Sequence, residues 1–156
     1  MSALMKTLMS KGNAMHVALY RRTGGRHFNR IKGLPVCLLT VPGRKTGTPR
    51  TTPIVYFERA GTWLVVGSAG GAKADPQWFR NLRMADRATL EIGDREHGVS
   101  VHITAGERPN ALWAWVVAQA PFFDGYRKKE GRNYPIAFPP RTPGGWPRRN
   151  ARTQAG

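Results

Sequence analysis

Apolar residues recur with two different periods along this 156-residue chain. Over residues 3–22, leucine and methionine return near the 3.6-residue spacing of an α-helix, between lysines and arginines. The apolar positions are Leu4, Leu8, Met15 and Leu19, and the basic ones are Lys6, Lys11, Arg21 and Arg22. The pattern predicts a basic amphipathic helix that either packs on the domain or contacts a membrane surface.

From residue 34 onward the period becomes that of β-strands. A short and almost continuous apolar run covers residues 34–41, and strands at 54–58 and 62–68 follow it, joined by a tight turn at 59–61. Apolar and polar residues then alternate in a second hairpin. Its strands span 88–94 and 97–104, and a sixth strand is expected at 134–138.

Two helices are predicted between these strands. The first covers residues 76–86, with Asp75 as its N-cap and Pro76 in its first turn. It places Trp78 beside Asn81 on one face, and a second, more apolar helix covers residues 107–120. Mostly antiparallel strands with inserted helices predict an α+β fold, a small β-barrel with helices packed around it.

Composition indicates a single domain with a strong positive charge. Twenty-five Lys and Arg residues against nine acidic ones give a formal charge of +16, and no acidic residue precedes Glu58. Such a field attracts nucleic acid, anionic lipid or an acidic small molecule. No apolar run is long enough for a membrane span and no secretory signal is visible, and the lone Cys37 lies in an apolar strand. These features predict a cytoplasmic protein with a buried thiol.

No familiar metal or nucleotide motif is present. The four histidines, His16, His27, His97 and His102, lack ligand spacing, so no metal site is predicted. Walker A, G-x-S-x-G and G-x-G-x-x-G patterns are missing as well.

Two segments could bind an anionic, flat ligand. The segment "GRKTGTPR", residues 43–50, combines two glycines with three cations and no carboxylate. It is either a basic hairpin loop or a seat for an oxyanion. In the second case Gly43 and Gly47 would permit positive φ, so that consecutive backbone N–H groups converge on the anion. The segment "VGSAGGAKADPQWFRNL" runs from a strand end at Ser68 through glycines into a helix with Trp78 and Asn81. Trp78 could stack on a ring or belong to the core.

Three stretches together, "TVPGRKTGTPRTTP", "GSAGG" and "DPQWFRNL", resemble the deazaflavin-dependent nitroreductase family, whose members include quinone reductases. The resemblance runs from about residue 20 to residue 138. It implies an FMN-binding-like split β-barrel over residues 23–138 that binds coenzyme F420. Residues 1–22 would be a helix in front of this domain, and the Pro/Arg-rich residues 139–156 are expected to form a disordered tail.

The resemblance also implies roles for individual residues. The phosphate end of the coenzyme would be held by Arg44, Lys45, Thr46, Gly47, Thr48, Pro49 and Arg50. The deazaflavin end would be lined by Ser68, Ala69, Trp78 and Asn81. Tyr126 is the expected proton donor at the acceptor site, with Ser68 as the second candidate, although Tyr126 could equally be a packed loop tyrosine.

The implied reaction is hydride transfer from reduced F420 to a quinone, a nitro compound or a similar acceptor. Two positions depart from the family pattern, because Ala69 replaces a lysine and Thr52 an asparagine, which leaves FMN open as an alternative cofactor. A basic nucleic-acid-binding domain is a further alternative, disfavoured because no recognition helix or RNP-like motif is visible. The protein is expected as a monomer or homodimer, and its first helix either packs on the domain, which is favoured, or contacts the inner face of the membrane.

Overall fold

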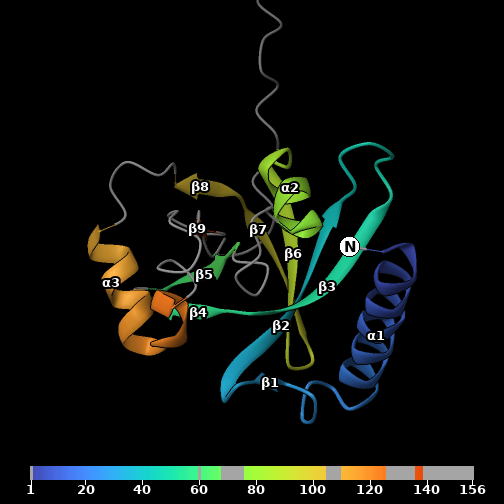
Figure 1. Cartoon of the computed structure of the whole chain (residues 1–156), viewed down its shortest axis with the longest axis horizontal. Helices are drawn as coiled ribbons and strands as arrows, with labels where there is room; N and C mark the ends of the chain where they lie inside the picture. Colours follow the sequence, from blue (N-terminus) through green and yellow to red (C-terminus); the bar gives the residue numbers. More distant parts are fainter. Residues whose placement is uncertain (1, 60, 68–75, 105–109, 126–135, 139–156) are drawn as a thin grey trace, which may run out of the picture.

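The structure is a computed structural model that describes residues 2–59, 61–67, 76–104, 110–125 and 136–138. Helices α1 to α3 and strands β1 to β9 occur in this part of the chain, with a further short helical segment at residues 122–125 (Figure 1). The helices are α1 (Ala3–Arg22), α2 (Gln77–Arg83) and α3 (Asn110–Gln119). The strands are β1 (Arg30–Ile31), β2 (Leu34–Pro42), β3 (Pro49–Val55), β4 (Phe57–Arg59), β5 (Thr62–Val66), β6 (Arg87–Ile92), β7 (Arg95–Ser100), β8 (His102–Thr104) and β9 (Ile136–Phe138).

The strands form two sheets, and every pairing within the described residues is antiparallel. The first sheet has the order β1-β2-β6-β7 with β3 on β2, and the second has the order β4-β5-β9-β8. The predicted mixed α+β class with antiparallel sheets is therefore confirmed. The finer prediction, that the two sheets make up a split barrel, stays a prediction.

Two predicted strands are each divided between the sheets. The run predicted at 54–58 breaks at Tyr56, so that β3 belongs to the first sheet and β4 to the second. The run predicted at 97–104 breaks in the same way at Val101, between β7 and β8. The prediction of a single continuous strand was wrong in both cases. The chain passes from one sheet to the other there without a glycine, proline or other turn signal at either break.

Helix α1 has the predicted bounds and covers one face of the first sheet. Ser2 caps its start, with its Oγ accepting from the backbone N–H of Met5 at 3.2 Å. Val17 and Tyr20 pack on Leu38 of β2, and the Tyr20 hydroxyl donates to the carbonyl of Val36 at 3.2 Å. Only the C-terminal third of α1 is thus anchored on the sheet.

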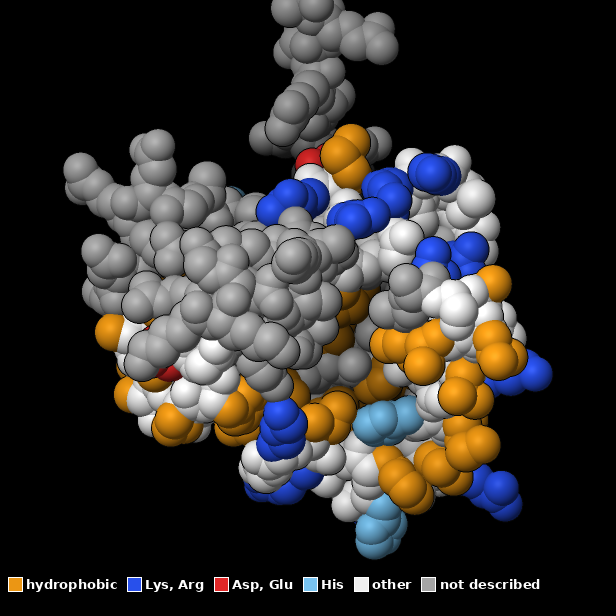
Figure 2. Space-filling model, in the orientation of Figure 1, with side chains coloured by type: hydrophobic (Ala, Val, Ile, Leu, Met, Phe, Trp, Pro, Cys, Tyr) orange, Lys and Arg blue, Asp and Glu red, His pale blue; other side chains and the backbone are white. Residues whose placement is uncertain are grey.

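The other two thirds of α1 expose apolar side chains among cations (Figure 2). The exposed large side chains are Leu4 at 79%, Leu8 at 65% and Met15 at 66%, with Met5 and Met9 beside them. No helix within the described ranges is both long and apolar enough to cross a membrane.

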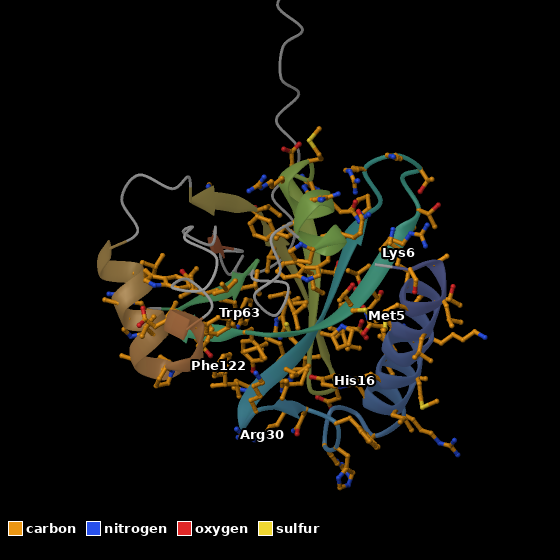
Figure 3. The ribbon with its side chains drawn as sticks, in the orientation of Figure 1. Met5, Lys6, His16, Arg30, Trp63 and Phe122 are labelled. Carbon is orange, nitrogen blue, oxygen red and sulfur yellow. The ribbon has the colours of Figure 1, made fainter. Side chains whose placement is uncertain are left out.

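The main core lies on the opposite face of the first sheet. Cys37, Leu39 and Val41 of β2 point into it, and Trp63 of β5 enters it from the second sheet (Figure 3). Phe79 and Leu82 fill the same core from α2. This packing holds α2 against the ends of β2 and β5 and so fixes its position at the top of the sheets (Figure 1).

Helix α3 covers the far face of the second sheet. Because side chains alternate along a strand, Leu64 and Val66 of β5 point away from the main core and pack against Trp113 and Val116. Figure 1 shows α1 and α3 at opposite sides of the molecule, with both sheets between them.

The start of α2 differs from its prediction. Pro76 is the N-cap residue, with φ −63° and ψ 155°, rather than the first helical residue. Its carbonyl accepts from the backbone N–H groups of Phe79 and Arg80, both at 3.0 Å. The prediction of an N-cap one residue earlier, at Asp75, is therefore wrong, and the predicted tail at 139–156 lies outside the described residues.

Candidate functional site

A tight loop of residues 43–48 joins β2 to β3, and Pro42 pairs with Pro49 at its base. The N–H of Gly43 donates to the carbonyl of Thr48 at 2.8 Å, and the N–H of Gly47 donates to the carbonyl of Gly43 at 2.8 Å. Gly47 has φ +71°, a conformation that L side chains rarely adopt. The loop is shorter than predicted, because Pro49 and Arg50 already belong to β3.

Most amides of this loop donate within the protein. Gly43 and Gly47 donate as above, the N–H of Thr48 donates to Thr46 Oγ1 at 3.2 Å, and that of Arg44 donates to a side chain of α2. The predicted convergence of consecutive N–H groups on an oxyanion would therefore be limited to Lys45 and Thr46. Anion binding at this loop has to come mainly from its side chains.

Helix α2 holds Arg44 by three hydrogen bonds. Asn81 Oδ1 accepts from the backbone N–H of Arg44 at 3.2 Å and from Arg44 Nη1 at 3.1 Å. Gln77 Oε1 accepts from the same Nη1 at 2.6 Å. Asn81 is only 7% exposed, whereas Gln77 and Arg44 lie at the surface. The two segments predicted from sequence thus meet through Arg44 and Asn81.

The other cations of the segment 43–50, one in the loop and one at the start of β3, are exposed. Neither Lys45 nor Arg50 makes a hydrogen bond or ion pair with any residue that the structure describes. Arg80 on the outer side of α2 is exposed as well. Figure 2 shows Lys and Arg side chains gathered over α2 and the β2–β3 loop. The site therefore carries positive charge that the surrounding protein leaves available to an anion.

Trp78 lies half-buried at the edge of the main core. Its ring packs against the core cluster and meets Phe79 edge to face, with ring centroids 5.4 Å apart. Part of the ring is accordingly structural, and part remains accessible to a ligand.

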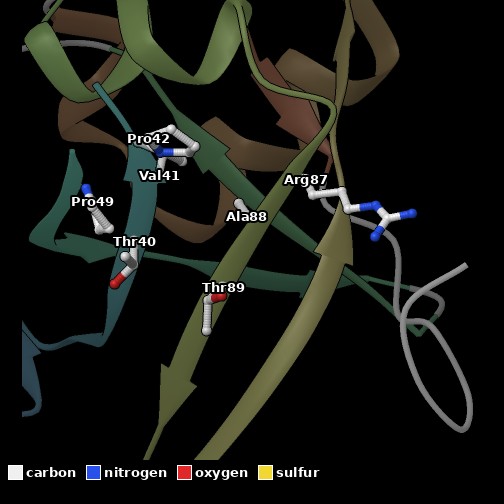
Figure 4. Close-up of a pocket in the computed structure, with 7 residues that line it drawn as sticks. All are labelled: Thr40, Val41, Pro42, Pro49, Arg87, Ala88 and Thr89. Carbon is white, nitrogen blue, oxygen red and sulfur yellow. The ribbon is translucent and has the colours of Figure 1, made fainter. Parts of the chain in front are cut away.

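A shallow hollow of about 240 Å³ lies elsewhere, on the outer face of the first sheet (Figure 4). Thr40 and Pro42 of β2 border it, with Pro49 of β3 and with Arg87 and Thr89 of β6. These residues alternate with Val41 and Ala88 of the core, so the hollow lies across the sheet from α2. It was not predicted. Pro42 and Pro49, which line it, also pair at the base of the 43–48 loop, so the hollow adjoins that loop on the face of the sheet away from α2.

Titratable groups of the core have no visible part in this site. Burial raises the pKa of the Cys37 thiol, in agreement with its predicted role as core filler. Burial also raises the pKa of Tyr20 and of Tyr56. Across the described ranges, no group of three His, Cys, Asp or Glu residues could hold a metal ion.

The structure brings together some of the predicted site residues. Arg44 and Asn81 are in contact, and Trp78 lies on the same short helix. Ser68, Ala69 and Tyr126 fall outside the described residues. Sequence reasoning missed Gln77, although its spacing of four residues from Asn81 places the two on one helix face.

Comparison with known proteins shows relatives over most of the chain. Residues 13–138 match the family model of F420H(2)-dependent quinone reductase. An F420H(2)-dependent quinone reductase of Mycobacterium tuberculosis is 31% identical over 126 residues, which are 78% of this chain and 85% of that protein. A solved F420-H2 dependent reductase matches with a TM-score of 0.60 and 26% identity, over 67% of this chain and 93% of that one. A solved domain-swapped dimer matches in fold, with a TM-score of 0.63 and 24% identity, over 86% of this chain and 98% of that one.

Proposed function

The chain belongs to the F420H(2)-dependent quinone reductase family, and from this premise we propose that it transfers a hydride from reduced F420 to a quinone. It is an F420-dependent reductase, and its cofactor is coenzyme F420. The observation that carries the proposal is the basic loop 43–48, which α2 holds through Arg44 while Lys45 and Arg50 stay unpaired among the described residues.

The charge of this loop suits the anionic end of the coenzyme. F420 carries a phosphodiester and an oligoglutamate tail, so a surface of cations without carboxylates complements it. We assign the phosphate end to the loop and the first residues of β3. The residues are Arg44, Lys45, Thr46, Gly47, Thr48, Pro49 and Arg50.

The reacting end is assigned to the second predicted segment. Ser68, Ala69, Trp78 and Asn81 would line the deazaflavin, and the accessible part of the Trp78 ring supports this placement. Bound F420 in its reduced form supplies a hydride, which carries two electrons. A protein group then has to donate one proton to yield the hydroquinone, and Tyr126 is the proposed donor, with Ser68 second. The same site would reduce nitro compounds.

Titration of the purified protein with F420 tests the cofactor assignment, with FMN and a DNA duplex titrated in parallel. Tryptophan fluorescence is the readout, because Trp78 is half-buried at the site. Saturable quenching by F420 alone supports the proposal. Quenching by FMN instead of F420 would identify a flavin enzyme, and a steeply salt-dependent response to DNA alone would identify a nucleic-acid binder.

We further propose that residues 1–22 contact an anionic membrane surface. Residues 23–138 would form the split-barrel domain, and residues 139–156 would form a tail. The exposed apolar side chains of α1 have Lys6 and Lys11 near them, and this combination suits the lipid headgroup boundary.

Co-sedimentation with phosphatidylserine vesicles tests this contact. Leu4→Gln with Leu8→Gln should reduce binding, because both side chains are exposed and make no core contact. Point variants are preferable to deletion of the helix, since Val17 and Tyr20 belong to the core. A wild-type protein that does not co-sediment with the vesicles would contradict the membrane contact. Dimers that form through these leucines would then explain their exposure.

A further inference from the structure

We propose that Gln77 and Asn81 are positioning residues that orient one edge of the Arg44 guanidinium toward the phosphate of the cofactor. This inference rests on the proposed function and adds a role for α2 at the anionic end of the site. The role falls on one residue without a predicted function, Gln77, and on one predicted to face the deazaflavin, Asn81.

The contacts of Arg44 use one nitrogen of its guanidinium completely. Nη1 has two N–H groups, which donate to Gln77 Oε1 at 2.6 Å and to Asn81 Oδ1 at 3.1 Å. Because arginine can only donate, both amide side chains must turn their oxygens toward it. The backbone N–H of Arg44 donates to the same Asn81 oxygen at 3.2 Å, so the side chain and the loop are held together.

The other edge of the Arg44 guanidinium is available to a ligand. Nε and Nη2 of Arg44 have no partner among the residues that the structure describes. These two nitrogens form the side of a guanidinium that matches two oxygens of one phosphate group in a bidentate pair. A lysine could not contact α2 with one nitrogen and the phosphate with two others, since it has a single ammonium group.

Fixing this edge before the ligand arrives should increase affinity. An exposed arginine loses rotamer freedom when it binds an anion, and that cost is smaller when the protein already holds the side chain. The holding helix is itself anchored, because Phe79 and Leu82 are buried in the main core. Gln77 lies outside that core, so its acceptor can be removed without opening a cavity.

The experiment compares Gln77→Met with Gln119→Met, a matched change of an exposed glutamine at the end of α3. Each variant is titrated with F420 and with the deazariboflavin fragment that lacks the phosphodiester and the glutamates. Q77M should weaken F420 binding by about two- to tenfold, the effect of releasing one ordered side chain. It should leave the fragment's Kd and the melting temperature unchanged, and Q119M should match the wild type throughout.

A double-mutant cycle shows whether Gln77 acts through Arg44. Once Arg44→Met has removed the guanidinium, Q77M should cause no further loss of F420 affinity. The inference is overturned if Q77M binds F420 like the wild type, if it weakens F420 and the fragment equally, or if it still weakens F420 in the R44M background. A wild-type protein that fails to bind F420 at all overturns the proposed function and this inference with it.

Discussion

Gly67 stands where β5 ends, and no larger residue fits there. A Cβ built on Gly67 would lie 2.7 Å from both Cγ and Cδ2 of the Phe79 ring, well inside ordinary van der Waals contact. Phe79 is completely buried, so its ring cannot move out into solvent. The substitution Gly67→Ala therefore has to displace Phe79, and α2 with it.

The expected cost follows from overpacking. Inserting a methyl group into a well-packed core costs about 1–3 kcal/mol. Alanine also lowers the conformational entropy of the unfolded chain, which offsets about 0.4–1 kcal/mol of this loss of stability. We expect G67A to lower the free energy of unfolding by about 1–2 kcal/mol. F420 affinity should fall too, because a shifted α2 withdraws Gln77 and Asn81 from Arg44.

Urea unfolding measures the stability change, and Gly12→Ala is the control. A Cβ at Gly12 meets nothing within 4 Å, and Gly12 lies in the exposed part of α1. G12A should stabilise the protein by up to about 1 kcal/mol through helix propensity. Adding Phe79→Leu to G67A should recover part of the loss. A G67A protein as stable as the wild type, with unchanged F420 affinity, would show that Phe79 and α2 do not depend on the absence of a Cβ at Gly67.

Three further predictions concern the core and the charged loop. Tyr20→Phe removes the hydroxyl oxygen that accepts from the Gly93 N–H at 2.9 Å. Urea unfolding should show a free energy of unfolding about 1–3 kcal/mol lower than that of the wild type. Burial raises the pKa of Tyr20 above its usual 10.0, so the unfolded chain loses the hydroxyl proton at lower pH than the folded protein does. The free energy of unfolding should therefore fall as the pH rises past 10.0, and it should fall less steeply in Y20F. A pH profile shared by both proteins would contradict that assignment. The buried Cys37 thiol should resist maleimide in native buffer and react in urea, and rapid native labelling would contradict its burial. Lys45→Met with Arg50→Met should weaken F420 binding about three- to tenfold at low salt and converge with the wild type at high salt; an equal loss at all salt concentrations would argue against a charge effect.

Local patterns predicted the elements whose signals are local. The spacing of apolar residues in α1 and the apolar run of β2 depend on neighbours in sequence, and both were placed nearly to the residue. The breaks at Tyr56 and Val101 could not be predicted, because they depend on which distant strand each half pairs with. The two-residue strand β1 likewise exists only through its pairing with Leu34 and Pro35.

The site shows the same limit. Sequence singled out the basic loop and the α2 segment, yet Arg44 and Asn81 are 37 residues apart, and only the fold brings them into contact. Glycines 43 and 47 were expected to free the loop amides for an anion. Instead the tight hairpin uses those amides itself, since Gly43 and Gly47 both donate within the loop.

Protein-dependent reoxidation of reduced F420 by a water-soluble quinone would demonstrate hydride transfer by this protein. The absorbance of oxidised F420 is followed anaerobically, and hydroquinone is quantified in the same samples. Hydride transfer predicts one hydroquinone formed per F420 oxidised, only when protein is present. Binding of F420 without any reoxidation by a panel of quinones would contradict the proposed quinone reductase activity.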